Sequence, residues 1–354
     1  MHVKTILSII LAAGFLSGCQ TGPYQQSDGV GDGSSQGGAG SAGTNVEFVV
    51  IGDMPYSDEE NEALTAPDGK FVKAIAALDP SVVVHYGDLK AGGENCDYTL
   101  MSARRDQVAG LHPGRVVFTP GDNDWTDCDR DFLSERFGES DRLALLRGLF
   151  YTGEGLQMSR DVPELVRQDG LTENAMWRIG DLAMGTLHIV GTDNGRREIL
   201  LGDVDVALDA VDYRDAKNMA WLEQMFSSAK SAKGLAIIFQ ADMYRPVDPE
   251  KAPKPVCSDE VRTGCDAYTT IRNAMENMAA KYGKPVIAIH GDTNAGCFNQ
   301  PSEVASNFWH LNGPGDYKFI DAAVVSFQPD ADVPFSVSGL LEGGTMPEVC
   351  DYSR

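Results

Sequence analysis

The sequence predicts an α/β fold, and three observations carry this prediction. Apolar runs alternate along the chain with segments whose apolar residues recur at helical spacing. Several of the apolar runs end in the dipeptide Gly-Asp, which is a turn signal. The order strand, helix, strand recurs from residue 45 onward with no internal repeat and no clear boundary. We therefore expect parallel strand pairing within one domain, residues 45–354.

The first half of this domain begins with an apolar run, VEFVVI, that is typical of a buried strand. Phe71, Val72, Ile75 and Leu78 follow at helical spacing. Further apolar runs and helical patterns complete this half. The expected elements are strands 46–51, 82–86 and 115–119, helices 69–78 and 99–110, and a largely helical stretch over 129–170 interrupted at 153–155 and 163.

In the second half, an amphipathic pattern with Trp221, Leu222, Met225 and Phe226 on one face predicts a long helix. A stretch rich in Pro and Cys, residues 246–266, is expected to be a loop closed by a disulfide. The remaining expected elements are strands 184–190, 235–239 and 285–289, helices 213–233 and 267–282, and two closing strands within 318–341.

The chain has 354 residues and a formal net charge of −23. This length provides enough apolar residues for a substantial core. Nucleic-acid phosphates and anionic membrane surfaces repel a chain of this charge. The composition therefore argues against nucleic-acid binding.

Residues 1–18 have the pattern of a bacterial lipoprotein signal peptide. Lys4 precedes an apolar run, 6–16, that is too short to span a membrane, and Leu-Ser-Gly-Cys ends it at Cys19. Lipidation of Cys19 would anchor the chain in the cell envelope, and Gln20 favours the outer membrane, facing the periplasm or the cell surface. An ordinary secretory signal is the alternative. Residues 19–44, rich in Gly and Ser, are expected to be a flexible tether.

Six cysteines follow Cys19, and an even number in an exported chain indicates disulfides. Cys257 and Cys265 are close in sequence and are expected to pair. Among the fifteen pairings that six cysteines allow, the remaining expected bonds are Cys96–Cys128 and Cys297–Cys350. None of the six has zinc-finger spacing with a histidine.

The dipeptide Gly-Asp ends four predicted strands, and the aspartates concerned are Asp53, Asp88, Asp122 and Asp292. In open α/β sheets, binding sites form beyond the carboxyl ends of the strands. One Gly-Asp is usually a plain turn. Four of them at strand ends predict a cup of carboxylates, and such a cluster calls for a cation.

This layout resembles the calcineurin-like metallophosphoesterases, whose members carry Asp-x-His, Gly-Asp, Gly-Asn-His-Asp/Glu, a lone His and Gly-His-x-His. The corresponding segments here are Asp53-Met54-Pro55, Gly87-Asp88, Gly121-Asp122-Asn123-Asp124, Gln240 and Gly291-Asp292-Thr293-Asn294. Four segments of the chain are similar to the motifs of an atypical branch of that family: GDMPY, HYGDLK, PGDNDWTDC and HGDTN. The resemblance covers nearly all of 45–354 and implies an α/β/β/α sandwich of two mixed sheets flanked by helices.

The resemblance also implies two divalent metal ions, with Asp88 bridging them. The implied metal ligands are Asp53, Asp88, Asp122, Gln240, Asp292 and Asn294. Each imidazole ligand of the family is replaced here by Pro, Gln, Asp or Asn. Such an oxygen-rich set favours Mn²⁺, Mg²⁺ or Ca²⁺ over Zn²⁺.

Asn123 stands where the family has its catalytic histidine. Its amide can donate a hydrogen bond to a phosphate oxygen but cannot deliver a proton. Lys90 is a candidate for countering the phosphate charge, or an ordinary solvated lysine. His85 and His290 precede two of the Gly-Asp pairs, and are either substitute ligands or buried structural histidines.

The function that follows is an envelope-anchored, metal-dependent phosphoesterase. It would hydrolyse a phosphate mono- or diester, a small molecule or a phospholipid-like substrate, with a metal-bound hydroxide as the nucleophile. It would touch the membrane only through the N-terminal lipid. Two alternatives remain open: a non-catalytic relative that binds a ligand, and a lipoprotein stabilised by Ca²⁺.

Overall fold

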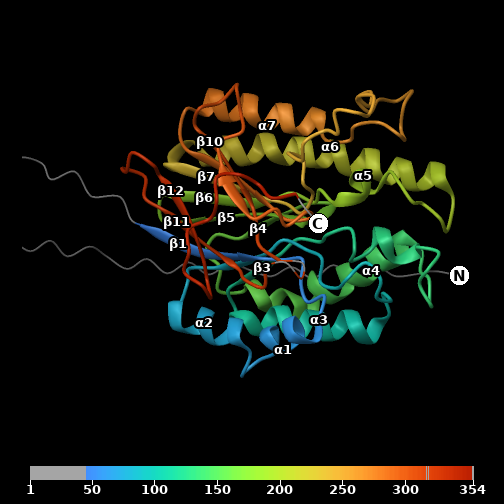
Figure 1. Ribbon diagram of the computed structural model, residues 1–354, viewed down its shortest axis with the longest axis horizontal. Helices are drawn as coiled ribbons and strands as arrows, with labels where there is room; N and C mark the ends of the chain where they lie inside the picture. The colour runs from blue at the N-terminus through green and yellow to red at the C-terminus, as the bar shows by residue number, and fades with distance from the viewer. Residues whose placement is uncertain (1–44, 316, 318, 353–354) are drawn as a thin grey trace, which may run out of the picture. The chain divides into compact units, whose positions relative to one another are not determined.

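The computed structural model describes residues 45–315, 317 and 319–352 as a sandwich of two mixed β-sheets flanked by helices (Figure 1). Helices α1 to α4 lie on one side of the sandwich, and α6 and α7 on the other. This arrangement confirms the α/β sandwich that the sequence predicted. The described helices are α1 (Asp58–Leu64), α2 (Lys70–Leu78), α3 (Tyr98–Leu111), α4 (Glu139–Phe150), α5 (Gly191–Gly195), α6 (Val204–Ser228) and α7 (Thr269–Tyr282), with 3₁₀ turns η1 (Thr126–Asp129), η2 (Gly153–Ser159) and η3 (Ala229–Ser231).

The first sheet has five strands in the order β12-β11-β1-β2-β3. The three strands β1, β2 and β3 pair in parallel, as the helical crossovers between them require. Strands β11 and β12 add antiparallel partners beside β1. The strands are β1 (Val46–Ile51), β2 (Val83–His85), β3 (Val116–Phe118), β11 (Ala323–Phe327) and β12 (Phe335–Gly339).

The second sheet has seven strands in the order β4-β5-β6-β7-β8-β10-β9. Its centre, β6 to β7 to β8 to β10, is parallel, and its two edges are antiparallel. The strands are β4 (Val166–Gln168), β5 (Leu171–Ile179), β6 (Leu182–Thr186), β7 (Gly234–Ile238), β8 (Val286–His290), β9 (Cys297–Asn299) and β10 (Phe308–Asn312).

The core lies in three layers, and strand β1 shows why. Its alternate side chains point to opposite faces of the sheet. Phe48 and Val50 belong to the layer between the two sheets, whereas Val49 and Ile51 belong to the layer under helices α1 to α4. A third layer packs α6 and α7 on the outer face of the second sheet. Because both faces of each sheet are covered, the parallel strands consist of nearly unbroken apolar runs.

Several sequence predictions of secondary structure were wrong, chiefly where buried polar residues hide a strand. Strand β5 lies in a segment for which we predicted no element, because Glu173 and Asn174 interrupt its apolar pattern although both are fully buried. Strands β9 and β10 were likewise not predicted. The stretch 129–170 is helical only in α4 and η2, and ends in β4. Helix α6 begins at Val204 rather than at 213, with Asp203 capping two backbone amides.

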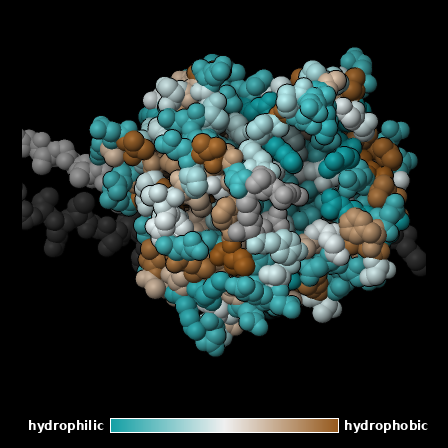
Figure 2. Space-filling view, in the orientation of Figure 1, coloured by the Kyte–Doolittle hydropathy of each residue, from teal (hydrophilic) through white to brown (hydrophobic). Residues whose placement is uncertain are grey.

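All three predicted disulfides are confirmed: Cys96–Cys128, Cys257–Cys265 and Cys297–Cys350. Within the described ranges, no helix is both long and apolar enough to span a membrane. The signal peptide, Cys19 and the tether lie outside the described residues. On the face seen in Figure 2, hydrophobic side chains are scattered among hydrophilic ones.

Candidate metal and phosphoester site

Four strand ends bring the predicted aspartates together, from two sheets rather than one. Asp53 follows β1, Asp88 follows β2 and Asp122 follows β3, all in the first sheet. Asp292 follows β8 in the second sheet. Asp53 and Asp88 are buried almost completely, and Asp122 is 6% exposed. We call this group, with Gln240 and Asn294, the acidic cup.

The backbone of the acidic cup is held in an unusual conformation. Asp53, Asp88, Asp292 and Asn294 all have positive φ, between 47° and 68°. L-residues rarely adopt this region, and Asp and Asn do so more easily than most. Gly87 has φ +105°, and a Cβ there would lie 2.2 Å from the backbone nitrogen of Gly121. The glycine of the motif is therefore required for the β2 and β3 ends to approach each other.

Asp88 is the most heavily contacted carboxylate of the cup. Its Oδ1 accepts the backbone N–H of Asn123 at 3.1 Å. Its Oδ2 accepts hydrogen bonds from the Tyr56 hydroxyl, Asn123 Nδ2 and Gln240 Nε2, at 3.0, 3.0 and 3.2 Å. Asn123 is half-buried, so its amide reaches both Asp88 and the open side of the cup. These contacts agree with the predicted location of Asn123 in the site.

Gln240 joins two carboxylates of the cup. Besides its bond to Asp88, its Nε2 donates to Asp122 Oδ1 at 3.0 Å. Its Oε1 accepts the backbone N–H of Gly191 at 2.7 Å. The amide therefore faces the aspartates with its N–H groups. Its role as a metal ligand through oxygen stays a prediction, and would require this amide to turn.

Asp122 and Asp292 face each other across Gly191. A Cβ on Gly191 would lie 2.5 Å from Asp122 Oδ2 and 2.9 Å from Asp292 Oδ1. The absence of a side chain at this position thus leaves the space between the two carboxylates open. Asp122 Oδ2 also accepts the Thr192 hydroxyl at 2.7 Å.

Asn294 completes the cup on the side of Asp53. It is 1% exposed, and neither Oδ1 nor Nδ2 of its amide has a hydrogen-bond partner among the described residues. A Cβ on Gly315 would lie 2.7 Å from Asn294 Nδ2 and 3.1 Å from Asp53 Cβ, so the two side chains border the same space. A buried amide without a partner costs about 1–3 kcal/mol.

Electrostatics favour a cation in the cup. Desolvation, followed by the charges of Asp122, Asp53, Asp124 and Asp292, raises the pKa of Asp88 well above its ordinary value. Desolvation, followed by the charges of Asp122 and Asp242, raises the pKa of Asp292 well above its ordinary value. Hard divalent cations bind oxygen ligands. A cation among these carboxylates would offset their mutual repulsion and could also be bound by the unpartnered amide of Asn294. The donor chemistry of these residues therefore suits such an ion.

Asp124 and Lys90 lie beneath the cup rather than in it. The Asp124 carboxylate accepts the backbone N–H groups of Asp88, Leu89 and Gly121, which ties the β2 and β3 turns together. Lys90 is fully buried, and its Nζ donates to the Ala91 carbonyl at 3.2 Å. Desolvation lowers the Lys90 pKa, and Asp124 is the largest opposing influence.

Helix α5 is a left-handed turn beside the cup. Thr192, Asp193 and Asn194 have φ of 53°, 51° and 56°. With these three, seven of the eleven non-glycine residues of positive φ in the described ranges lie at or beside the cup. Backbone of this kind costs roughly 1–2 kcal/mol per residue, and proteins keep it mainly at functional sites.

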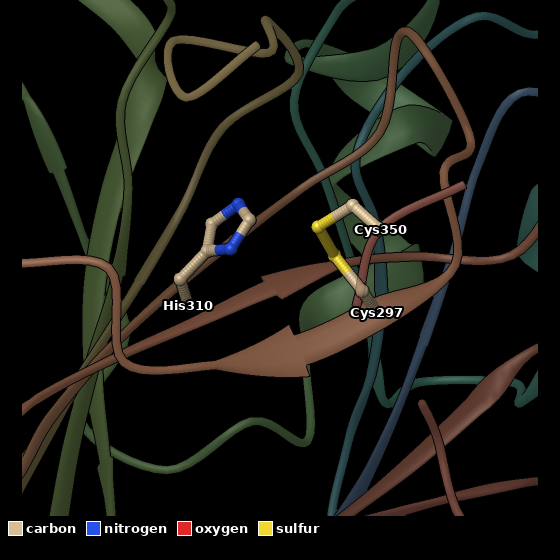
Figure 3. Close-up of side chains that lie close together, drawn as sticks. All are labelled: Cys297, His310 and Cys350. Atoms are coloured by element: carbon tan, nitrogen blue, oxygen red, sulfur yellow. A yellow bond between two sulfur atoms is a disulfide. The ribbon is translucent and has the colours of Figure 1, made fainter. Parts of the chain in front are cut away.

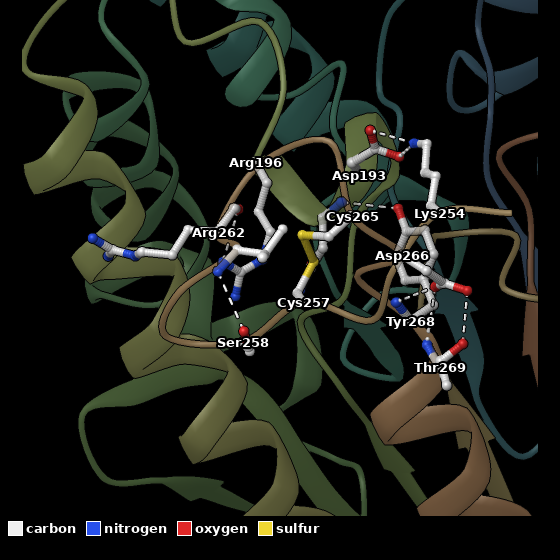
Figure 4. The surroundings of a disulfide bond; sticks show 12 residues. Asp193, Arg196, Lys254, Cys257, Ser258, Arg262, Cys265, Asp266, Tyr268 and Thr269 are labelled. Carbon is white, nitrogen blue, oxygen red and sulfur yellow. Dashed lines mark hydrogen bonds and ion pairs between the residues drawn. A yellow bond between two sulfur atoms is a disulfide. The ribbon is translucent and has the colours of Figure 1, made fainter. Parts of the chain in front are cut away.

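The loop that contains Cys257–Cys265 covers this left-handed turn (Figure 4). Lys254 Nζ contacts both carboxylate oxygens of Asp193 at 2.9 Å. The Tyr268 hydroxyl, at the start of α7, accepts the Asn194 N–H at 2.9 Å and donates to the Val190 carbonyl at 2.8 Å. These contacts fix Thr192 against Asp122.

Three further residues border the cup and were not predicted from the sequence: Tyr56, Thr192 and Arg130. Arg130 pairs with Asp127 Oδ2 at 2.5 Å and with Glu198 Oε2 at 3.0 Å. A Cβ on Gly92 would lie 2.5 Å from Arg130 Nη1 and 2.8 Å from Asn123 Oδ1, so Arg130 lies beside Asn123 at the rim. No periodic pattern marks such residues, although Arg130 lies only seven residues after Asn123.

The histidines before two of the Gly-Asp pairs are buried. His85 accepts the Gly87 N–H at its Nδ1, and desolvation lowers its pKa to about 3, which fits the structural alternative. Trp125 is also buried and packs against His188 and Arg214.

Comparison with known proteins gives only distant matches. No protein-family model matches the chain, and no curated protein matches it in sequence. Among solved structures, a 5'-nucleotidase from Candida albicans SC5314 is 11% identical, with a TM-score of 0.41, over 83% of this chain and 50% of its own. The Haemophilus influenzae NAD nucleotidase is 12% identical, with a TM-score of 0.37, over 86% and 54%. The chain thus spans about half the length of these structures, and the likenesses are too weak to support an activity.

Proposed function

We propose that the acidic cup binds divalent cations through oxygen ligands and that the protein hydrolyses a phosphate mono- or diester there. The observation that carries this proposal is the meeting of four buried or half-buried aspartates, where desolvation and then mutual repulsion raise the pKa of Asp88 and Asp292. Asp53, Asp88, Asp122, Asp292 and Asn294 would hold the ions, with Gln240 once its amide has turned. Bound ions would supply Lewis acidity and lower the pKa of a water molecule.

The chain's own residues supply binding and orientation. Asn123 Nδ2 donates to Asp88 and to the Tyr56 hydroxyl, and it would exchange one of these two bonds for a phosphate oxygen when substrate binds. We assign the counter-charge for the phosphate to Arg130 rather than to Lys90, because Arg130 lies at the rim and Lys90 is fully buried. Arg also matches phosphate geometry better than Lys. We further propose that lipidation of Cys19 anchors the protein in the bacterial envelope.

The hydrogen bonds of Gln240 favour a second function. Its Nε2 donates to Asp88 and Asp122, and thereby satisfies part of the negative charge without a cation. With no imidazole in the cup, general acid catalysis is also missing. The protein would then be a non-catalytic binder of a ligand or of Ca²⁺.

The test uses the full chain, purified in detergent, loaded with Mn²⁺ and desalted. We expect about two Mn²⁺ per chain by mass spectrometry, and their loss in Asp88→Asn. Asp79→Asn is the matched control, since Asp79 also has positive φ but ends helix α2, away from the cup. Loaded protein is then assayed with p-nitrophenyl phosphate and bis-p-nitrophenyl phosphate.

The outcomes separate the two functions. Hydrolysis that depends on Mn²⁺ and on Asp88 supports the phosphoesterase. Bound Mn²⁺ without hydrolysis of either ester supports the non-catalytic binder. If Asp88→Asn holds as much Mn²⁺ as the unaltered chain, the cup is not the cation site, and both the phosphoesterase and the Ca²⁺ binder are excluded.

A further inference from the structure

Behind the cup, Asp242, His290 and His310 form a second cluster of potential metal ligands. One ligand atom from each lies within 4.8 Å of the others, and all three side chains are buried. Asp242 follows β7, His290 ends β8, and His310 lies in the neighbouring strand β10. His290 Nε2 lies 2.7 Å from His310 Nε2 and 3.7 Å from Asp242 Oδ1.

The other nitrogen of each imidazole is already engaged. His290 Nδ1 lies 3.0 Å from the Gly291 carbonyl oxygen, and His310 Nδ1 lies 3.1 Å from Asn299 Oδ1. The orientation of the Asn299 amide is fixed, because its Nδ2 donates to the Glu348 carbonyl at 2.9 Å. Both Nδ1 atoms therefore face acceptors and must carry the proton.

The three contacts of the two imidazoles need one more proton than two neutral rings supply. The contacts to Gly291 and Asn299 and the contact between the two Nε2 atoms each need one N–H. Two neutral imidazoles supply only two N–H groups. With both protons on Nδ1, the two Nε2 lone pairs point at each other across 2.7 Å, unless a cation lies near them.

We propose that this cluster is a zinc site, with His290 Nε2, His310 Nε2 and Asp242 Oδ1 as protein ligands. Metal-bound histidines almost always donate their second ring N–H to an oxygen acceptor, as both do here. Two imidazoles and a carboxylate are a ligand set that Zn²⁺ takes when its fourth position is left to water. The site does not depend on catalysis in the acidic cup.

The surroundings suit a bound ion better than a third proton. Both rings are almost completely buried, and a charged group is costly in such a place unless it is paired. Aromatic rings enclose the cluster, with Phe239 stacked on His290 and Tyr244 tilted against His310. Asp242 Oδ2 is held by Asn312 Nδ2 and the Thr293 hydroxyl, which keeps the carboxylate in position.

The pair of imidazoles needs only a small opening to hold an ion. At a zinc–nitrogen distance of about 2.0–2.1 Å, two tetrahedral ligands lie roughly 3.3 Å apart. The two rings would therefore separate by about 0.6 Å from their present contact. Cys297 and Cys350 also lie near His310, but their sulfurs are joined in a disulfide and are not free to bind an ion (Figure 3).

Such a zinc ion would fix the strand ends that support the cup. Asp242 donates its backbone N–H to Asp292 Oδ2 at 3.2 Å, and His290 is two residues before Asp292. The ion would join β7, β8 and β10 at the point where the second sheet contributes its carboxylate.

The test exploits the absence of imidazole among the cup residues. The full chain and the Asp88→Asn, His310→Gln and Asn299→Ala variants are loaded with Zn²⁺, desalted and analysed by mass spectrometry and X-ray absorption. We expect an imidazole-ligated zinc, about one per chain, in the unaltered chain and in Asp88→Asn. The signal should vanish in His310→Gln. Affinity should fall about 10- to 100-fold in Asn299→Ala, which removes the acceptor of His310 Nδ1 together with the bond from Asn299 to the Glu348 carbonyl.

His85→Gln is the control, since His85 is equally buried but outside the cluster. It should keep the imidazole-ligated zinc. If His310→Gln does not fold, the X-ray absorption spectra of the unaltered chain and of Asn299→Ala decide whether imidazole binds the zinc. Zinc with oxygen ligands only, or no bound zinc, overturns the proposal and leaves a shared proton between the rings.

Discussion

The backbone N–H of Asp292 donates to Asp53 Oδ1 at 3.0 Å, and this bond joins the ends of strands from different sheets. The same approach brings a Cβ on Gly291 within 1.8 Å of Asp53 Oδ2, so only glycine is accommodated there. The acidic cup is thus built where the two layers of the sandwich meet, and its carboxylates depend on the packing of both sheets.

Replacing Gln240 with Glu tests whether its amide stands in for a cation. Two hydrogen bonds to charged groups are lost and a like charge is added, so at pH 8 the metal-free protein should lose about 3 kcal/mol of unfolding free energy. Added Mn²⁺ should restore more stability in this variant than in the unaltered chain. Chemical denaturation with and without Mn²⁺ measures both effects.

Gln107→Glu is the control for this experiment, because Gln107 donates from its Nε2 to Asn61 and Thr65, away from the cup. It should show no added dependence on Mn²⁺. Equal responses of the two variants would contradict the role assigned to Gln240.

Glu139 should make stability fall as the pH rises. Desolvation, with Asp129 the next largest cause, raises its pKa to about 8. The folded state therefore keeps a proton that the unfolded chain releases above about pH 4.3. Between these values the folded protein binds more protons, so this group's contribution to stability declines up to about pH 8.

Glu139→Gln should remove this decline, and the variant should be more stable than the unaltered chain at pH 8, but not at pH 4. The difference is expected to be on the order of a few kcal/mol. Thermal unfolding across this range measures it, with the exposed Glu135→Gln as control. Parallel pH profiles for the Glu139 variant and the unaltered chain would show that the carboxyl stays ionised.

Arg130 and Lys90 should respond oppositely to substitution. Arg130→Gln removes a rim cation and should raise KM for p-nitrophenyl phosphate about 10-fold or more, since a charged hydrogen bond contributes about 1.5–3 kcal/mol. Lys90→Met should lower thermal stability and leave KM unchanged, because Lys90 is buried beside Asp124. Steady-state kinetics and thermal unfolding of both variants separate binding from folding. A rise in KM only for Lys90→Met would reverse the assignment.

Cys19→Ala tests the proposed anchor. The variant should incorporate no labelled palmitate and should move from the membrane fraction to the soluble fraction, because the lipid is the expected membrane contact. Cys257→Ala with Cys265→Ala is a control that removes two other cysteines and should keep the label. Unchanged fractionation of Cys19→Ala would exclude this anchor.

The strands that carry the cup could be predicted because their signals are local. An apolar run followed by Gly-Asp identifies β1, β2, β3 and β8 without knowledge of the rest of the chain. Strand β5 could not be found in this way. Buried Glu173 is paired with Arg147 and buried Asn174 with Asn218, and such partners are not apparent from a local pattern.

The same limit applies to the site. The strand-end aspartates and Asn123 follow from motif order, but Thr192 reaches Asp122 from 70 residues away. Its left-handed backbone is held by Tyr268 and Lys254, which have no local sequence signal. The Asp242–His290–His310 cluster was also out of reach, because His310 lies in a strand that we did not predict.

The Cys96–Cys128 bond has a consequence for when the protein becomes competent. Both sulfurs lie next to the Asn123 carbonyl, at 3.8 and 3.9 Å, so the disulfide closes the loop that contains Asp122 and Asn123. A newly synthesised copy in a reducing compartment has free thiols there and lacks this closure. If the chain is exported as we propose, closure of this loop would follow its arrival in an oxidising compartment.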